Sequence, residues 1–234
     1  MIDKRLALIW HPGSNGEPLT AVPLSTPPCL FDSFIINDMD ASSTLFFVCD
    51  IQERFRTVIH GFDEVVASTN KMLKIAKLLE CEVIVTTQKS RALGQTDPAI
   101  DLASLGSLVI GPIDKTLFSM ITPEVVEHLT ARPHIKTAVV MGNEAHICIL
   151  QTALSLVARG YRVVVLADAV SSANAAEIPI ALAQMRAAGI VVSTTESLGF
   201  QLVQDASAPV FRSFSAIIKE SKDATKQALS VLIS

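Results

Sequence analysis

The stretch VVMGNEAHICILQTAL, residues 139–154, joins an apolar run with β-strand character to an apolar run with helical character. The junction contains Gly142 and Asn143, followed by an acid (Glu144), an imidazole (His146) and a thiol (Cys148). In parallel α/β sheets, ligands bind beyond the carboxyl ends of the strands. The junction therefore indicates the class of fold and marks a candidate site.

Strand-like and helix-like runs alternate on both sides of this stretch, at intervals of roughly 25–30 residues, which is typical of βαβ units. The expected strands are 44–50, 82–88, 136–142, 161–168 and 190–196. The expected helices are 61–80, 122–132, 145–160 and 173–189, with further helices after residue 197. Strands that are apolar on both faces indicate a parallel sheet covered by helices on both sides. We therefore predict a doubly covered α/β fold.

The two ends of the chain differ from this pattern. Residues 1–43 hold five of the eleven prolines and show no clear period, so we treat them as an N-terminal extension of unknown role. Met39 is a candidate for an alternative start. The expected organisation is this extension, one α/β domain at 44–220, and a polar C-terminal tail at 221–234.

Composition excludes several classes of function. The net charge of -4 provides no basic surface for nucleic acid or an anionic membrane. No apolar run approaches the ~20 residues that span a bilayer. The four cysteines have no paired spacing, which favours a reducing compartment. Cys49 and Cys81 lie in or beside apolar runs, where cysteine usually serves as a small buried hydrophobe. We expect a cytoplasmic protein, with organellar targeting by residues 1–43 as the alternative.

Several common site motifs are absent. Gly106 and Gly111 have the spacing of a phosphate-binding loop, but Pro112 stands where that loop needs its lysine, and Lys115 comes three residues late. No GxGxxG follows a strand, and the five histidines form neither HExxH nor an Asp-x-His cluster. No GxSxG elbow occurs. We therefore expect no cofactor and no metal.

Three chemically active residues remain near strand ends: Asp50, Lys115 and Cys148. The positive end of a helix and a nearby ammonium both favour a thiolate, and a carboxylate can accept its proton. A single helical cysteine is more often a core residue, so the hypothesis depends on all three lying together.

Three segments resemble the isochorismatase-like cysteine hydrolase superfamily, and within it the isochorismatase domain-containing proteins. They are FVCDIQERFR (47–56), KTLFSM (115–120) and GNEAHICILQTAL (142–154). The resemblance covers about residues 44–220. It implies a three-layer α/β/α fold around a six-stranded, mostly parallel sheet. The five strands expected above are therefore one too few, and we place the sixth at 108–110.

The resemblance also implies roles for these residues. Asp50 would be the general base and Cys148 the nucleophile, with Lys115 bridging them electrostatically. The peptide between Asn143 and Glu144 would be cis, and the backbone amides of Glu144 and Cys148 would form the oxyanion hole. The expected substrate pocket holds Gln52, Phe55, Gln88, Asn143 and His146.

Cys148 narrows the expected reaction. In this superfamily, amidases of the nicotinamidase and N-carbamoylsarcosine type have this cysteine, whereas enzymes that cleave the vinyl ether of isochorismate lack it. We expect a metal-independent, homo-oligomeric cysteine hydrolase that acts on a small amide or related carbonyl compound through an acyl-enzyme. Thr87 and Lys89 depart from the family pattern beside the pocket. The alternative is a binding or scaffold protein that keeps the fold without turnover, and a redox-sensitive Cys148 is compatible with either.

Overall fold

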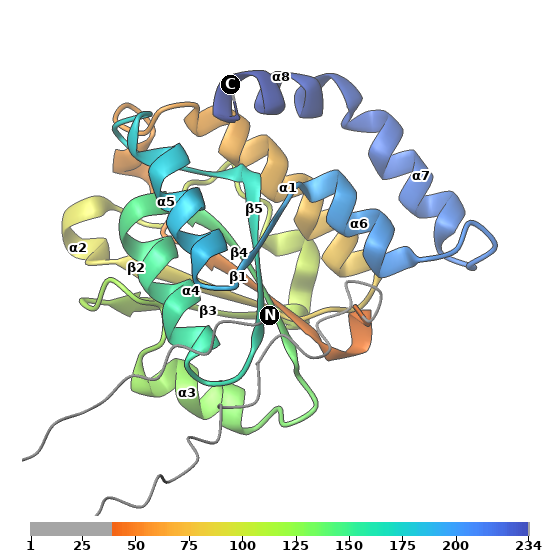
Figure 1. The fold of residues 1–234 in the computed structure, drawn as a ribbon, viewed down its shortest axis with the longest axis horizontal. Coiled ribbons are helices and arrows are strands. Elements are labelled where there is room, and N and C mark those ends of the chain that lie inside the picture. Colours follow the sequence, from red (N-terminus) through yellow and green to blue (C-terminus); the bar gives the residue numbers. More distant parts are fainter. Residues whose placement is uncertain (1–38, 234) are drawn as a thin grey trace, which may run out of the picture. The chain divides into compact units, whose positions relative to one another are not determined.

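The computed structural model describes residues 39–233, which form a six-stranded sheet between two layers of helices (Figure 1). The strand order is β3-β2-β1-β4-β5-β6, and all neighbouring strands are parallel. The strands are β1 (Thr44–Cys49), β2 (Val83–Gln88), β3 (Val109–Lys115), β4 (Thr137–Asn143), β5 (Arg162–Ser171) and β6 (Val191–Ser193). The predicted α/β fold and its six-stranded sheet are confirmed.

The helices follow the predicted alternation with the strands. They are α1 (Phe62–Leu78), α2 (Ser90–Leu93), α3 (Pro123–Thr130), α4 (Leu150–Val157), α5 (Glu177–Ala187), α6 (Thr195–Val203), α7 (Phe211–Glu220) and α8 (Lys222–Leu232). Short 3-10 turns occur at Ala41–Ser43, Glu53–Phe55 and Ala103–Leu108. A π-helical turn, Ala145–Ile149, leads into α4. None of the helices within residues 39–233 is long and apolar enough to cross a membrane.

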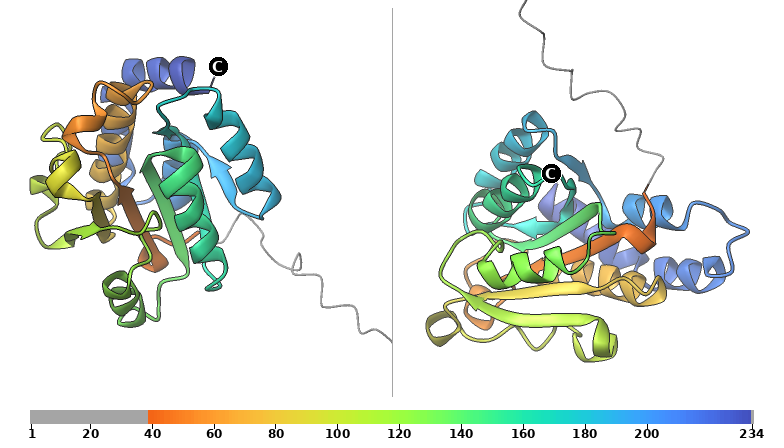
Figure 2. Two further views of the ribbon diagram at one scale, coloured as in Figure 1. Left: turned by 90° about the vertical axis from the view of Figure 1, so that its left-hand side faces the viewer. Right: turned by 90° about the horizontal axis from the view of Figure 1, so that it is seen from below.

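The central strand β1 shows why both faces of the sheet are apolar. Successive side chains of a strand point to opposite faces. Phe46 and Val48 pack in one core with residues of α1, α6, α7 and α8. Leu45 and Phe47 pack in a second core with residues of α3, α4 and α5. Figure 2 shows the helices on the two sides of the sheet.

Element boundaries differ from the predicted ones where side chains cap a helix. β6 is three residues long, and the chain turns into α6 directly after it. The hydroxyl of Thr194 caps α6 by accepting a hydrogen bond from the Ser197 amide. The opposite occurs at β3, which extends well beyond the predicted 108–110 and ends at Lys115. This extension matters because it places Lys115 at the carboxyl end of the sheet.

The C-terminal end of the described chain also differs from expectation. The predicted polar tail is instead mostly a helix, because Lys222–Leu232 form α8, which packs on α1 and β5. Thr225, Ala228 and Leu232 are buried, and their three- and four-residue spacing places them on one helical face. The polar residues between them cover the opposite face and dilute the apolar signal. Most of the N-terminal extension, residues 1–38, lies outside the described residues.

Candidate functional site

The candidate site lies at the carboxyl ends of β1, β3 and β4. Asp50 directly follows β1, Lys115 ends β3, and Cys148 lies in the π-helical turn that follows β4. Gly142 lets β4 approach β1 closely, since a Cβ at this position would collide with the Cys49 carbonyl. Its φ of 120° is also one that residues with a side chain rarely adopt. Sheet topology and this close approach bring together residues that are far apart in sequence.

A buried ion pair forms the centre of the site. Lys115 Nζ donates to Asp50 Oδ2 at 2.7 Å, and both side chains are at most 1% exposed. The other Asp50 oxygen accepts from the Thr86 hydroxyl at 2.8 Å. Lys115 also donates to Gln88 Oε1 at 2.7 Å and lies 3.0–3.1 Å from the carbonyl oxygens of Leu117 and Phe118. All its protons therefore have acceptors.

The surroundings of Lys115 favour its charged form. Burial by itself lowers the pKa of Lys115, but interactions with Cys49, Asp50 and Cys148 outweigh it and raise this pKa above its ordinary value. Cys148 therefore lies within electrostatic reach of Lys115. Among the described residues, no hydrogen bond joins the Cys148 thiol to Asp50. Lys115 is accordingly the group that interacts with both.

The backbone around Cys148 is held in place. The Cys148 carbonyl accepts from the Thr152 hydroxyl at 2.6 Å, and that hydroxyl accepts from the Met120 amide at 2.9 Å. These bonds tie the start of α4 to the loop that follows Lys115. The Asn143–Glu144 peptide is cis, as the resemblance implies. The Glu144 amide donates no hydrogen bond to another described residue.

The residues expected to line the pocket divide into two groups. Gln88 holds Lys115 and donates to the Thr116 carbonyl at 3.0 Å. Gln52 is fully buried, and its amide is bonded to the Gln88 backbone and the Gly94 carbonyl, so it braces the site from behind. Phe55 packs against the α1 side of the core.

The other pocket candidates surround the turn after β4. His146 Nδ1 lies 2.8 Å from the Ser172 hydroxyl, and Glu144 Oε2 accepts from the Ala173 amide at 2.7 Å. Both side chains therefore tie this turn to the loop after β5. Asn143 is fully buried, and neither its amide oxygen nor its amide nitrogen has a partner among the described residues. A buried amide with both polar atoms unpaired is uncommon, and such groups occur often at functional sites.

Cys49 is the residue of the site that was not predicted. It is the last residue of β1, fully buried, and lies in the same core as Cys148. Burial raises the pKa of the Cys49 thiol well above its ordinary value, and the neighbouring Cys148 thiol and the charge of Asp50 raise it further. The alternation of Leu45, Phe47 and Cys49 indicates the face of the sheet on which Cys49 lies, but not that Cys148 lies on the same face.

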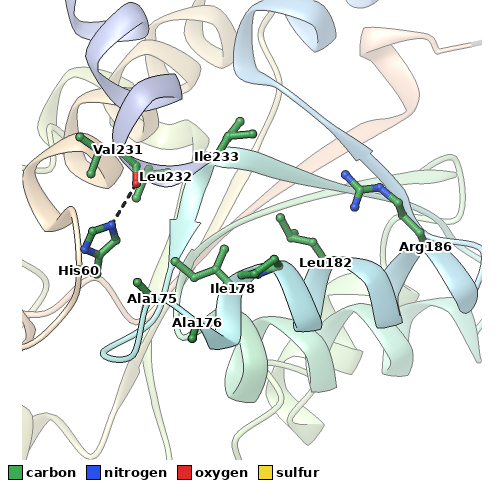
Figure 3. Close-up of a pocket in the computed structure, with 10 residues that line it drawn as sticks. His60, Ala175, Ala176, Ile178, Leu182, Arg186, Val231, Leu232 and Ile233 are labelled. Atoms are coloured by element: carbon green, nitrogen blue, oxygen red, sulfur yellow. Dashed lines mark hydrogen bonds between the residues drawn. The ribbon is translucent and has the colours of Figure 1, made fainter.

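A cavity of about 530 Å³ lies elsewhere, between α5 and the end of α8 (Figure 3). Its lining is mostly apolar: His60, Ala175, Ala176, Ile178, Pro179, Leu182, Arg186, Val231, Leu232 and Ile233. None of the predicted site residues lines it. His60 connects it to the loop after β5, because the His60 amide donates to the Ser172 carbonyl at 3.0 Å. Within residues 39–233, no three His, Cys, Asp or Glu side chains form a group that could hold a metal ion.

Comparisons with known proteins agree with this architecture. The family model described as "Isochorismatase domain" matches residues 44–197. The chain is 39% identical over 203 residues to isochorismatase domain-containing protein 1 of Salmo salar, covering 87% of this chain and 69% of that protein. It is 42% identical over 179 residues to the secreted isochorismatase effector Isc1 of Phytophthora sojae, covering 76% and 85%.

The fold also matches solved structures. One, described as the MAR1 ribonuclease from Caenorhabditis elegans, superposes with a TM-score of 0.70 at 32% sequence identity. The match covers 77% of this chain and 92% of that one.

Proposed function

Because the chain belongs to the isochorismatase domain family, we propose that Asp50, Lys115 and Cys148 form the catalytic triad of a cysteine hydrolase. The observation that carries this proposal is the buried 2.7 Å ion pair of Asp50 and Lys115 beside the Cys148 thiol. Taking two charges out of water costs several kcal/mol per ion, so this pair is a poor device for stability alone. A buried acid, base and nucleophile at one sheet edge favour a catalytic role.

The proposed reaction is acyl transfer. The Cys148 sulfur attacks the carbonyl carbon of the substrate while Asp50 accepts the thiol proton, and Lys115 stabilises the negative charge that moves between them. The backbone amides of Glu144 and Cys148 donate to the developing oxyanion. The departing amine takes the proton from Asp50. Water, activated by Asp50, then hydrolyses the acyl-enzyme and frees Cys148.

The proposed substrate is a small amide or a related carbonyl compound. Cys148 supports this class because a thiol nucleophile forms a covalent acyl intermediate, which cleavage of a vinyl ether does not need. The Asp-x-His metal motif of nicotinamidases is absent from the chain, so we propose metal-independent chemistry. Thr87 is occupied in donating to Asp114 at 3.0 Å, and Lys89 is exposed, so this part of the pocket differs from the family pattern.

Two alternative functions, RNA cleavage and binding without turnover, determine which controls the assay needs. The similar C. elegans protein is described as a ribonuclease. A net charge of -4 gives this chain little attraction for a polyanion, so RNA belongs in the assay as a comparison substrate. The binding or scaffold alternative predicts that small amides bind without turnover. We propose a homo-oligomer in the cytoplasm for either reading.

Turnover of a panel of small amides tests the function. We expect Cys148→Ser and Asp50→Asn to abolish hydrolysis, and mass spectrometry to find the acyl group on Cys148 in the wild type. Cys81→Ser is the matched control, because Cys81 is also buried but lies in the core on the other face of the sheet. Full turnover by Cys148→Ser would exclude the proposed nucleophile. Binding of amides without turnover by the wild type would support the scaffold alternative.

A further inference from the structure

The site contains a second thiol that hydrolysis does not use. Cys49 immediately precedes Asp50, and its Cα pairs with Gly142 across β1 and β4. Six residues after Gly142, the chain returns over the same face of the sheet and places Cys148 in the core that contains Cys49. Cys148 is among the groups that raise the pKa of the Cys49 thiol, so the two thiols are neighbours within this core, and both are free.

The two thiols differ in their access to solvent. Cys49 is 0% exposed and Cys148 is 7% exposed, so a small molecule that enters the site meets Cys148 first. Cys148 also lies within electrostatic reach of the buried Lys115 ammonium. Cys49 is held as a protonated thiol by burial, and protonated thiols react slowly with oxidants. Cys148 is therefore placed to be oxidised first, and Cys49 is placed to react with the oxidised Cys148.

We propose that Cys148 is a modification site for hydroperoxides and that Cys49 is its resolving thiol, so that oxidation ends in a reversible Cys49–Cys148 disulfide. In the first step, the Cys148 thiolate attacks the hydroperoxide, the O–O bond breaks, and an alcohol or water leaves. Cys148 becomes a sulfenic acid, a two-electron oxidation matched by the two-electron reduction of the peroxide.

In the second step, the Cys49 sulfur attacks the Cys148 sulfur. The S–S bond forms, the S–O bond breaks, and the hydroxyl group leaves as water with the proton of Cys49. Asp50, the next residue in the chain, is placed to accept that proton in transit. The disulfide removes the nucleophile while protecting Cys148 from further, irreversible oxidation. A thiol reductant restores both cysteines.

The test uses the full chain with Cys29→Ser and Cys81→Ser, which leaves Cys49 and Cys148 as the two thiols. After treatment with hydrogen peroxide, we expect a protein two hydrogen atoms lighter and a disulfide-linked peptide that joins Cys49 to Cys148. Dithiothreitol should restore the starting mass. Adding Cys49→Ser should instead give Cys148 carrying one oxygen that dimedone captures, followed by two and three oxygens that dithiothreitol does not remove.

Two controls keep the proposal falsifiable. Thermal unfolding verifies that the Cys49→Ser chain is folded, and if it is not, the linked peptide in the parent chain decides the question alone. Irreversible oxidation of Cys148 at the same rate with and without Cys49, and no linked peptide, would overturn the proposal. The assay needs no hydrolase substrate, so its failure and the failure of the proposed hydrolysis are separate results.

Discussion

Lys115 and Lys71 are both buried, with 4% and 3% exposure, but their surroundings are opposite. Lys115, at the carboxyl end of β3, pairs with the carboxylate of Asp50 and donates to Gln88. Lys71, in the middle of α1, reaches under α8 and donates to the Thr225 hydroxyl at 2.7 Å. Burial lowers the pKa of Lys71 below its ordinary value, and the more distant charges of Asp168 and Glu196 oppose this only in part.

The two sites use different parts of the lysine side chain. The charge of Lys115 interacts with its neighbours, whereas the long aliphatic stem of Lys71 fills space between helices. Around Lys115 the chain supplies a carboxylate, an amide oxygen and backbone carbonyls, which together raise the pKa of Lys115 despite burial. Among the described residues, Lys71 has one hydrogen-bond partner, the neutral hydroxyl of Thr225, so its ammonium is poorly compensated. Its aliphatic stem still fills space between two helices. We infer that the charge of Lys115 serves the site, whereas the charge of Lys71 is a cost that the packing of α8 outweighs.

The largest effect is expected from Lys115→Met. It leaves the buried carboxylate of Asp50 without its cation, and breaking a buried pair costs about 3–5 kcal/mol of unfolding free energy. Amide turnover should disappear as well. Urea denaturation and the amide assay measure the two effects, with Lys71→Met as the matched control because it is the same change at equal burial.

A double variant separates stability from catalysis. Adding Asp50→Asn to Lys115→Met removes the unpaired charge, so part of the lost stability should return while turnover stays absent. Equal destabilisation by Lys115→Met and Lys71→Met would contradict the distinction between the two lysines.

A smaller effect is expected from Gln88→Ala. Gln88 positions Lys115 through its amide oxygen while its amide nitrogen bonds the Thr116 carbonyl. A hydrogen bond to a charged group contributes about 1.5–3 kcal/mol, so we expect a stability loss in this range. Because Lys115 keeps Asp50, kcat/KM should fall about tenfold rather than vanish. Gln201→Ala should leave kcat/KM unchanged, because the Gln201 amide nitrogen bonds the exposed Ser197 hydroxyl and its amide oxygen has no partner among the described residues.

The fold and the candidate site residues could be predicted from short sequence patterns. The fold was predictable because the central strands β1, β2, β4 and β5 are apolar on both faces and helices alternate with strands along most of the chain. Asp50, Lys115 and Cys148 could be proposed as site residues because each lies in a motif near a strand end. These signals are local, because each is contained in one short segment of the sequence.

The missed features depend on contacts between distant segments. The placement of Cys49 beside Cys148 follows from the β1–β4 register and from the turn after Asn143, neither of which is written in the residues around Cys49. The role of Gln52 depends on where the Gln88 backbone passes. The helix α8 was missed because its buried positions are separated by polar residues that face outward.

The smallest effect, and the one that tests the comparison most directly, is expected from Lys71→Met. Since the folded-state pKa of Lys71 is lowered from the ordinary 10.5, folding disfavours its charged form. The resulting cost is complete at pH values below the folded-state pKa, fades as the pH rises through it, and is absent above 10.5. At neutral pH, Lys71→Met removes this cost together with the bond to Thr225. The net change should therefore lie between no effect and a gain of about 1 kcal/mol.

The pH dependence of this gain decides between the two views of Lys71. The advantage of Lys71→Met over the wild type should shrink as the pH rises from 7 toward 10.5, and denaturant titrations along this range measure it. Lys115 has the opposite sign, because its raised folded-state pKa makes its contribution complete below 10.5 and lost only as the pH rises further. An advantage that grows with pH, or a loss at pH 7 as large as that of Lys115→Met, would mean that the charge of Lys71 stabilises the fold. The two lysines would then be alike, and burial beside a hydroxyl would be as favourable as burial beside a carboxylate.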